Sequence, residues 1–125
     1  MPVPRITKEA LMQRLEPLDA ASVPVVIDVR LKYPYEHSTV KLPGAIRVSP
    51  HDPTAASLPR DREVVAYDSD PDELVSSRVA ATLIREGYRA SALKGGINDW
   101  LTAKYPTDTK DAPKQKPPTA GALKS

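Results

Sequence analysis

The sequence has 125 residues, with 18 Lys and Arg against 16 Asp and Glu, 14 Pro, and neither Cys nor Phe. This length corresponds to one domain, since domains usually contain roughly 100–150 residues, and a hydrophobic share of 40% is enough for a modest core. The absence of cysteine excludes disulfide bonds, thiolate zinc sites and every mechanism that depends on a cysteine nucleophile.

The formal net charge of +2 lies at the C-terminal end of the sequence. Residues 108–125 contain four Lys and two Asp, which gives +2 and leaves residues 1–107 formally neutral. A neutral body argues against nucleic-acid binding, which depends on clustered Lys and Arg. No apolar run approaches the roughly 20 residues that span a bilayer, and the start MPVPRITKEA lacks the basic-then-apolar pattern of a signal peptide. We therefore expect a cytoplasmic protein that binds neither nucleic acid nor membrane.

Composition divides the chain into a folded domain at residues 1–107 and a tail at residues 108–125. The tail is rich in Pro, Lys, Thr and Ala and has almost no large apolar side chains. Burial of such a surface cannot offset the entropy lost on ordering, so the composition predicts a disordered segment.

The first predicted helix follows Thr7, a good N-cap, with Ile6 and Leu11 spaced as a hydrophobic staple. Short runs of branched apolar residues predict three strands after it, with one helical turn between the first two. These elements are predicted at residues 24–29 (strand), 33–37 (helical turn), 45–48 (strand) and 63–67 (strand).

The most strongly patterned helix begins after the third strand. Asp70 is its predicted N-cap, Pro71 takes the first helical position, and Glu73 completes a capping box. Apolar residues then recur every four positions, at Val75, Val79 and Leu83. Gly87 follows at a position suited to end the helix.

A fourth strand at residues 89–93 and a short helix at residues 97–103, with Trp100 as a core anchor, complete the domain. The alternation of strands and helices predicts an α/β fold with a mostly parallel sheet. In such sheets, ligands bind beyond the carboxyl ends of the strands. Three of these ends are residues 28–30, 48–50 and 68–70.

Several motifs along this framework occur in a specific order and spacing. They are Val26-Ile27-Asp28-Val29-Arg30 with Glu36 after it, Leu42-Pro43-Gly44-Ala45-Ile46, Val64-Val65-Ala66-Tyr67, Ser76-Ser77-Arg78-Val79-Ala80-Ala81, Leu93-Lys94-Gly95-Gly96-Ile97-Asn98-Asp99-Trp100, and Tyr105-Pro106. With these motifs the chain resembles the rhodanese-like (thiosulfate sulfurtransferase) domain family over about residues 5–107. The resemblance implies a rhodanese-like α/β fold, with a five-stranded, mostly parallel sheet flanked by helices on both faces.

The resemblance also implies where an active site would lie. Active family members carry a cysteine directly after the strand matched by residues 64–67, and this cysteine takes up sulfur as a persulfide among backbone N–H groups. One subgroup has cysteines at both positions that Asp68 and Asp70 occupy here. Either aspartate could therefore match the nucleophile of ordinary members, and neither is a thiol. The chain also departs from many members at Val40-Lys41, where they have Gly-His.

A carboxylate cannot hold sulfur as a stable S–S linkage, because that chemistry needs a polarisable thiolate. Acidic residues at the start of a helix also repel anionic sulfur donors. We therefore expect a catalytically inactive rhodanese-like binding or regulatory module, with no catalytic residue, metal or cofactor, that binds an unidentified protein or small molecule. The predicted equivalent of the active-site loop comprises Asp68, Ser69, Asp70, Pro71, Asp72, Glu73 and Arg78. Asp28 and Arg30 are placed at the pocket rim, where a structural salt bridge is expected, either between the two or with Arg47 or Glu36.

Two alternatives are compatible with the sequence. One is a Mg²⁺-dependent phosphoryl hydrolase with Asp68 as nucleophile, since Asp-x-Asp after an apolar strand begins such sites in haloacid-dehalogenase-like phosphatases. The other is a variant of a thiosulfate sulfurtransferase in which the cysteines were replaced. For the acidic loop itself, the sequence leaves three uses open: helix caps and solvated charges, a surface for a basic partner, or a divalent-cation site.

Overall fold

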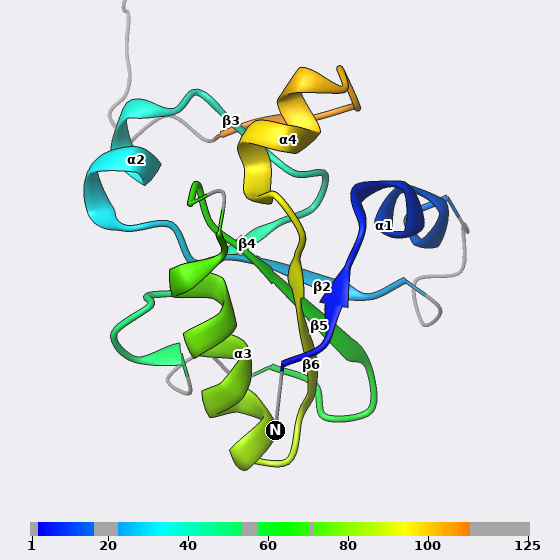
Figure 1. Ribbon diagram of the computed structural model, residues 1–125, viewed down its shortest axis with the longest axis vertical. Helices are drawn as coiled ribbons and strands as arrows, with labels where there is room; N and C mark the ends of the chain where they lie inside the picture. The colour runs from blue at the N-terminus through cyan, green and yellow to red at the C-terminus, as the bar shows by residue number, and fades with distance from the viewer. Residues whose placement is uncertain (1–2, 17–22, 54–57, 71, 111–125) are drawn as a thin grey trace, which may run out of the picture.

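The computed structural model describes residues 3–16, 23–53, 58–70 and 72–110 (Figure 1). The elements in chain order are β1 (Arg5–Ile6), α1 (Lys8–Arg14), β2 (Val25–Asp28), α2 (Lys32–His37), β3 (Val40–Lys41), β4 (Ile46–Arg47), β5 (Glu63–Tyr67), α3 (Leu74–Arg85), β6 (Arg89–Leu93), α4 (Gly96–Thr102) and β7 (Asp108–Thr109). Within these ranges no helix combines the length and the apolar character needed to cross a membrane.

The five-stranded sheet has the strand order β1-β6-β5-β2-β4, and all of its neighbouring strands are parallel. The predicted α/β architecture with a five-stranded parallel sheet is therefore confirmed. Helices cover both faces of this sheet, so its inner strands read as nearly continuous apolar runs, VVID in β2 and EVVAY in β5. A separate antiparallel pair joins β3 to β7.

Alternate residues of each inner strand enter different cores. Val25 and Ile27 pack in one buried cluster with Leu83 of α3, whereas Val26 packs in another with Trp100 of α4 and with residues of α1. Because successive side chains of a strand point to opposite faces, α3 covers one face of the sheet and α1 and α4 cover the other (Figure 1).

Most predicted elements are found near their predicted positions. Thr7 caps α1, since its hydroxyl oxygen accepts a hydrogen bond from the Ala10 N–H at 3.1 Å. The strands β5 and β6 have the predicted bounds, whereas the strands predicted at residues 24–29 and 45–48 are shorter in the structure. Trp100 is fully buried, as expected for a core anchor.

The ordered domain extends past its predicted end at residue 107. Strand β7 pairs with β3, and the Lys110 N–H donates a hydrogen bond to the Thr39 carbonyl oxygen at 2.9 Å. These contacts use backbone groups, which an argument from apolar composition does not take into account. The prediction of disorder is therefore wrong for residues 108–110, and the rest of the predicted tail, residues 111–125, lies outside the described residues.

Candidate functional site

The loop between β5 and α3 lies at the carboxyl edge of the sheet, where the sequence analysis placed the candidate site. Asp68 is the first residue after β5, and only 1% of its surface is exposed. Its Oδ1 accepts a hydrogen bond from the Asp70 N–H at 2.8 Å, and its Oδ2 accepts one from the Ser76 N–H at 2.6 Å. The carboxylate is thus folded back onto the first turn of α3, with both oxygens bound.

Two opposing effects act on this carboxylate. Burial raises the pKa of Asp68, because removal from water disfavours the charged form, and the hydrogen bonds from the Ser76 and Asp70 N–H groups act in the lowering direction. Backbone N–H groups at a helix N-terminus are the usual binding partners of an anion. Here a side chain of the chain itself takes that position.

The predicted capping box of α3 is wrong. The helix begins at Leu74, and Glu73 before it has a left-handed backbone conformation (φ 54°, ψ 38°) without a side-chain cap bond. The Asp70 carboxylate accepts instead from the nearby Asp72 N–H at 2.8 Å, a local turn contact that competes with helix capping. Pro71, predicted at the first helical position, lies outside the described residues.

Glu73 is drawn away from the helix by long-range contacts. Only 1% of its surface is exposed, and its carboxylate accepts hydrogen bonds from Arg5 Nε at 2.5 Å and from the Gly95 N–H at 3.1 Å. Burial opposes ionisation of Glu73, but the hydrogen bonds from Arg5 and Gly95 outweigh it and lower the pKa of this carboxyl. Arg5 lies far away in the sequence, so no local pattern could have indicated this pair.

The turn at residues 94–95 and the first residues of α4 contact the loop from the other side. The Ile97 N–H donates to the Asp68 carbonyl oxygen at 2.9 Å, and the Asn98 side-chain amide donates to the Ser69 carbonyl oxygen at 3.0 Å. At Gly96 (φ +64°), an added Cβ would lie 2.5 Å from the Asp68 carbonyl oxygen. A glycine is therefore required here both by the backbone angle and by the close approach of the two loops.

The remaining residues of the predicted loop point outward. Asp72 and Arg78 are exposed and Asp70 is half-buried, and within the described residues none of the three forms an ion pair. Arg78 therefore does not neutralise the acidic groups of the loop through a direct contact. The exposed part of the loop is acidic, and Leu74 beside it is 62% exposed.

An open pocket of about 350 Å³ lies beside the loop, on the side of Glu73. Charged side chains of both signs line it, and the sequence analysis did not single out this pocket. Its principal residues are Arg5, Thr7, Lys8, Glu73, Lys94 and Asp99. Several of these charges are already paired, since Lys8 Nζ lies 2.9 Å from an Asp99 carboxylate oxygen.

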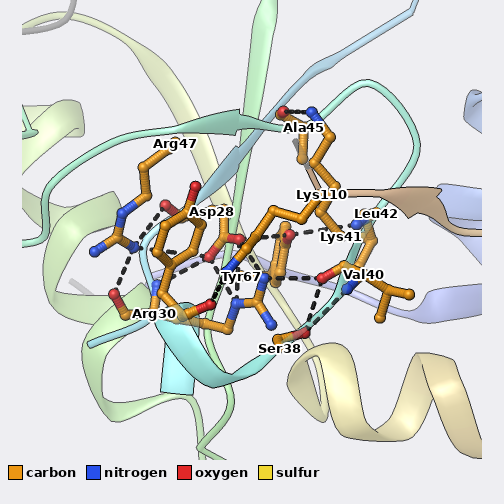
Figure 2. A network of polar contacts seen from close by, with 11 residues as sticks. Asp28, Arg30, Ser38, Val40, Lys41, Leu42, Ala45, Arg47, Tyr67 and Lys110 are labelled. Carbon is orange, nitrogen blue, oxygen red and sulfur yellow. Dashed lines mark hydrogen bonds and ion pairs between the residues drawn. The ribbon is translucent and has the colours of Figure 1, made fainter. Parts of the chain in front are cut away.

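Asp28 and Arg30 form a buried ion pair next to the loop's supporting strand (Figure 2). Arg30 Nη2 lies 2.6 Å from Asp28 Oδ2, and the Tyr67 hydroxyl donates to the same oxygen at 2.9 Å. With exposed fractions of 1% and 2%, these residues lie below the surface and not at an open rim. Burial, followed by the negative charge of Asp28, raises the pKa of Tyr67.

A metal site needs several ligands in one place. Among the residues that the structure describes, no group of three or more His, Asp or Glu side chains is arranged to hold an ion. Both carboxylate oxygens of Asp68 accept hydrogen bonds from backbone N–H groups, and one carboxylate oxygen of Asp70 accepts a hydrogen bond from the Asp72 N–H. These oxygens are therefore already engaged by the chain itself.

Comparison with known proteins agrees with this architecture. The sequence matches the rhodanese-like domain family over residues 7–103. A solved structure of a full-length protein from Lactobacillus plantarum has a TM-score of 0.75 at 21% identity, covering 85% of this chain and 88% of that one. A rhodanese-like domain protein from Staphylococcus aureus has a TM-score of 0.68 at 20% identity, covering 86% and 99%. A possible tyrosine phosphatase from Rhodopseudomonas palustris has a TM-score of 0.70 at 19% identity, covering 85% of each chain.

A comparison with curated proteins gave no match. The solved structures show the fold alone at these identities. The fold and the loop at its carboxyl edge define an α/β domain with one candidate site between β5 and α3. The family match covers most of the sequence, and the chain belongs to the rhodanese-like domain family. It does so without any cysteine.

Proposed function

We propose that this chain is a non-catalytic rhodanese-like domain that acts as a binding or regulatory module. The observation that supports this proposal most directly is the position of Asp68. Its carboxylate accepts hydrogen bonds from the Ser76 N–H in the first turn of α3 and from the Asp70 N–H in the loop, and an anionic sulfur donor would need such N–H groups. An oxygen nucleophile in that place cannot form a persulfide, since no S–S bond can form on oxygen.

The exposed side of the loop is the proposed recognition surface. Asp72 and the half-buried Asp70 present negative charge, and Leu74 adds an exposed apolar side chain. A protein partner with basic and apolar groups complements this surface.

The alternative of a phosphoryl hydrolase is disfavoured by the same geometry. Nucleophilic attack on phosphorus needs a carboxylate oxygen that faces an open site, next to a bound Mg²⁺. Asp68 is 1% exposed and both of its oxygens accept backbone N–H groups, so neither is directed toward a substrate.

Sulfur transfer provides the direct test of inactivity. The chain is incubated with thiosulfate, thiocyanate formation from added cyanide is measured, and the intact mass is recorded after donor exposure. We expect no turnover and no added sulfur on the chain. Turnover above the protein-free rate, or a sulfane adduct on the unmodified chain, would refute the proposal. Asp68→Cys and Asp70→Cys serve as comparison variants, because they return a thiol to each candidate position.

Recognition by the acidic loop is tested separately with a pentalysine peptide as probe. We expect its addition to shift the NMR amide signals of residues 70 and 72–78, and Asp72→Asn to weaken this binding. Glu86 is exposed and directly follows α3, at the opposite end of that helix from the loop, so Glu86→Gln, which removes the same charge, serves as the control. Equal shifts across the whole molecule would contradict a recognition surface at the loop.

A further inference from the structure

Strand β7, the last element that the structure describes, is bound to the domain through its backbone and its side chains. It pairs antiparallel with β3, and the register places Asp108 opposite Lys41. The Lys110 N–H continues the pairing with a hydrogen bond to the Thr39 carbonyl oxygen at 2.9 Å. An edge of β3 thus binds an extended segment of chain, which is also how sheet edges bind peptides.

The side chains of Asp108 and Lys110 each have a partner outside β7. Asp108 Oδ2 accepts a hydrogen bond from the Gly44 N–H at 2.7 Å. Lys110 Nζ donates to the Tyr35 carbonyl oxygen and lies 4.0 Å from the centroid of the Tyr35 ring. Thr109, between them, is exposed. The contacts therefore recognise the first and third residues of the segment, an Asp-x-Lys pattern.

Contacts that do not involve β7 hold this edge in place (Figure 2). Arg30 Nη2 donates to the Val40 carbonyl oxygen at 3.1 Å, and the Ser38 hydroxyl donates to the same oxygen at 2.9 Å. The Leu42 N–H, directly after β3, donates to the Tyr67 hydroxyl at 3.3 Å. Because Arg30 and Tyr67 are buried, the domain itself positions β3 for a strand partner, and such preorganisation favours binding.

The attachment of β7 is weak. Both of its residues are exposed, so the pairing buries no apolar side chain, and single exposed hydrogen bonds contribute little net free energy. Lys110 is also opposed by its surroundings. Burial lowers the pKa of Lys110 first and Arg30 and Arg47 lower it further, whereas Asp28 and Glu36 act in the raising direction. Terminal segments held in this way open locally at a small cost in free energy.

We propose that β3 and its neighbours form a peptide-binding site for extended segments in which Asp stands two positions before Lys. This β3 edge site consists of Tyr35, Thr39, Val40, Lys41 and Gly44, and residues 108–110 are its internal ligand. An Asp-x-Lys segment of a protein partner binds in the same way when it displaces β7. No residue of the acidic loop belongs to the site, so this proposal does not depend on recognition by that loop.

The bound state of β7 sets a scale for the affinity. A segment on a short flexible tether has an effective concentration on the order of millimolar. Since β7 is paired with β3 in the structure, the untethered segment should bind with a dissociation constant on the order of millimolar or tighter. NMR titration covers this range.

The test uses the full-length, ¹⁵N-labelled chain with Asp108→Ala and Lys110→Ala together, which weakens the internal ligand and leaves the β3 edge site unchanged. The probe is the peptide Pro-Thr-Asp-Thr-Lys, the sequence of residues 106–110, with both ends blocked. We expect saturable shifts of the amides of the β3 edge site, and weaker binding to the parent chain, where β7 competes. The peptide Pro-Thr-Lys-Thr-Asp has the same composition with the charges exchanged. It should bind about ten-fold more weakly or worse, because both charge-assisted contacts are lost.

Thr109→Ala is the matched control in the chain, because Thr109 is exposed and lies between the two recognised residues. It should bind the probe as weakly as the parent does. Circular dichroism checks that each variant is folded, and Asp108→Ala alone decides the result if the double variant unfolds.

Three outcomes would overturn the proposal. They are the absence of saturable shifts up to about 10 mM peptide, which is above the expected range, equal binding of the two peptides, and equal binding to Thr109→Ala and to the double variant. The amides that should shift here differ from those of residues 70 and 72–78, so a failure of this site is distinguishable from a failure of recognition by the acidic loop.

Discussion

Replacement of Asp28 by Asn tests how the fold keeps a buried guanidinium. The substitution keeps the shape of the side chain but removes the charge that Arg30, only 2% exposed, is bound to. In the unmodified chain, the two carboxylate oxygens of Asp28 accept hydrogen bonds from Arg30 and from the Tyr67 hydroxyl. In the variant, the amide side chain has only one oxygen to accept them, and its NH₂ group faces these donors. Breaking a buried pair in this way costs about 3–5 kcal/mol, because an uncompensated charge remains.

The magnitude is measured by urea denaturation and by thermal unfolding. For a domain of this size, roughly 4–8 °C are lost per kcal/mol, so we expect Asp28→Asn to lower Tm by at least about 12 °C. Asp72→Asn is the matched control, since Asp72 is exposed and should change stability by less than about 0.5 kcal/mol. A loss below about 1 kcal/mol for Asp28→Asn would refute the reasoning.

A double substitution separates the unpaired charge from lost packing. If the cost arises from the charge left on Arg30, then Asp28→Asn combined with Arg30→Met should be less destabilised than Asp28→Asn alone. A double variant that is less stable by the sum of both single losses would show that packing and hydrogen bonds, not the buried charge, determine the effect.

Three further predictions concern the loop and the core. The pKa of Glu73 in the folded state is lowered from 4.5, so its ion pair stabilises the domain above that pH, and this contribution disappears as pH falls through the folded pKa. Glu73→Gln should therefore be less stable than the parent at pH 7. In unfolding measurements, this difference in stability should shrink toward pH 3. Gly96→Ala should destabilise the domain by well over 1 kcal/mol, because its Cβ would meet a carbonyl oxygen, whereas Gly44→Ala, at a similar φ with nothing within 4 Å, should cost only about 1 kcal/mol of backbone strain. Leu83→Ala, at a fully buried position, should cost about 3 kcal/mol in urea denaturation, and a loss under 1 kcal/mol would contradict its place in the core.

The sequence was sufficient for the elements whose signals are local. The apolar run at residues 63–67 and the cap at Thr7 depend on neighbours within a few positions, and both were found as predicted. The family motifs gave the sheet and its helices in the same way, because their spacing is a property of the chain alone.

The loop could not be predicted, because its conformation depends on distant residues. A capping box at Asp70 and Glu73 is a sound local inference, but Glu73 pairs with Arg5 across 68 positions of sequence. The contact between Lys110 and Tyr35, in which Lys110 Nζ lies 4.0 Å from the ring centroid, was missed for the same reason, since Lys110 lay in a segment predicted to be disordered. The sequence also left two aspartates as matches for the nucleophile, and the structure adds that Asp68 is the one bound to the start of α3.

The N-terminal strand has a consequence for how the protein folds. Arg5 pairs with Ala92 in the sheet, so β1 has no neighbouring strand until β6 has been made. Closing so long a stretch of chain is entropically costly and makes this pairing a late step. Because Arg5 also holds Glu73, the loop acquires its final shape only when the two ends of the domain have met. A nascent chain that stops short of residue 92 therefore lacks a formed candidate site, even though every residue of the loop is already present.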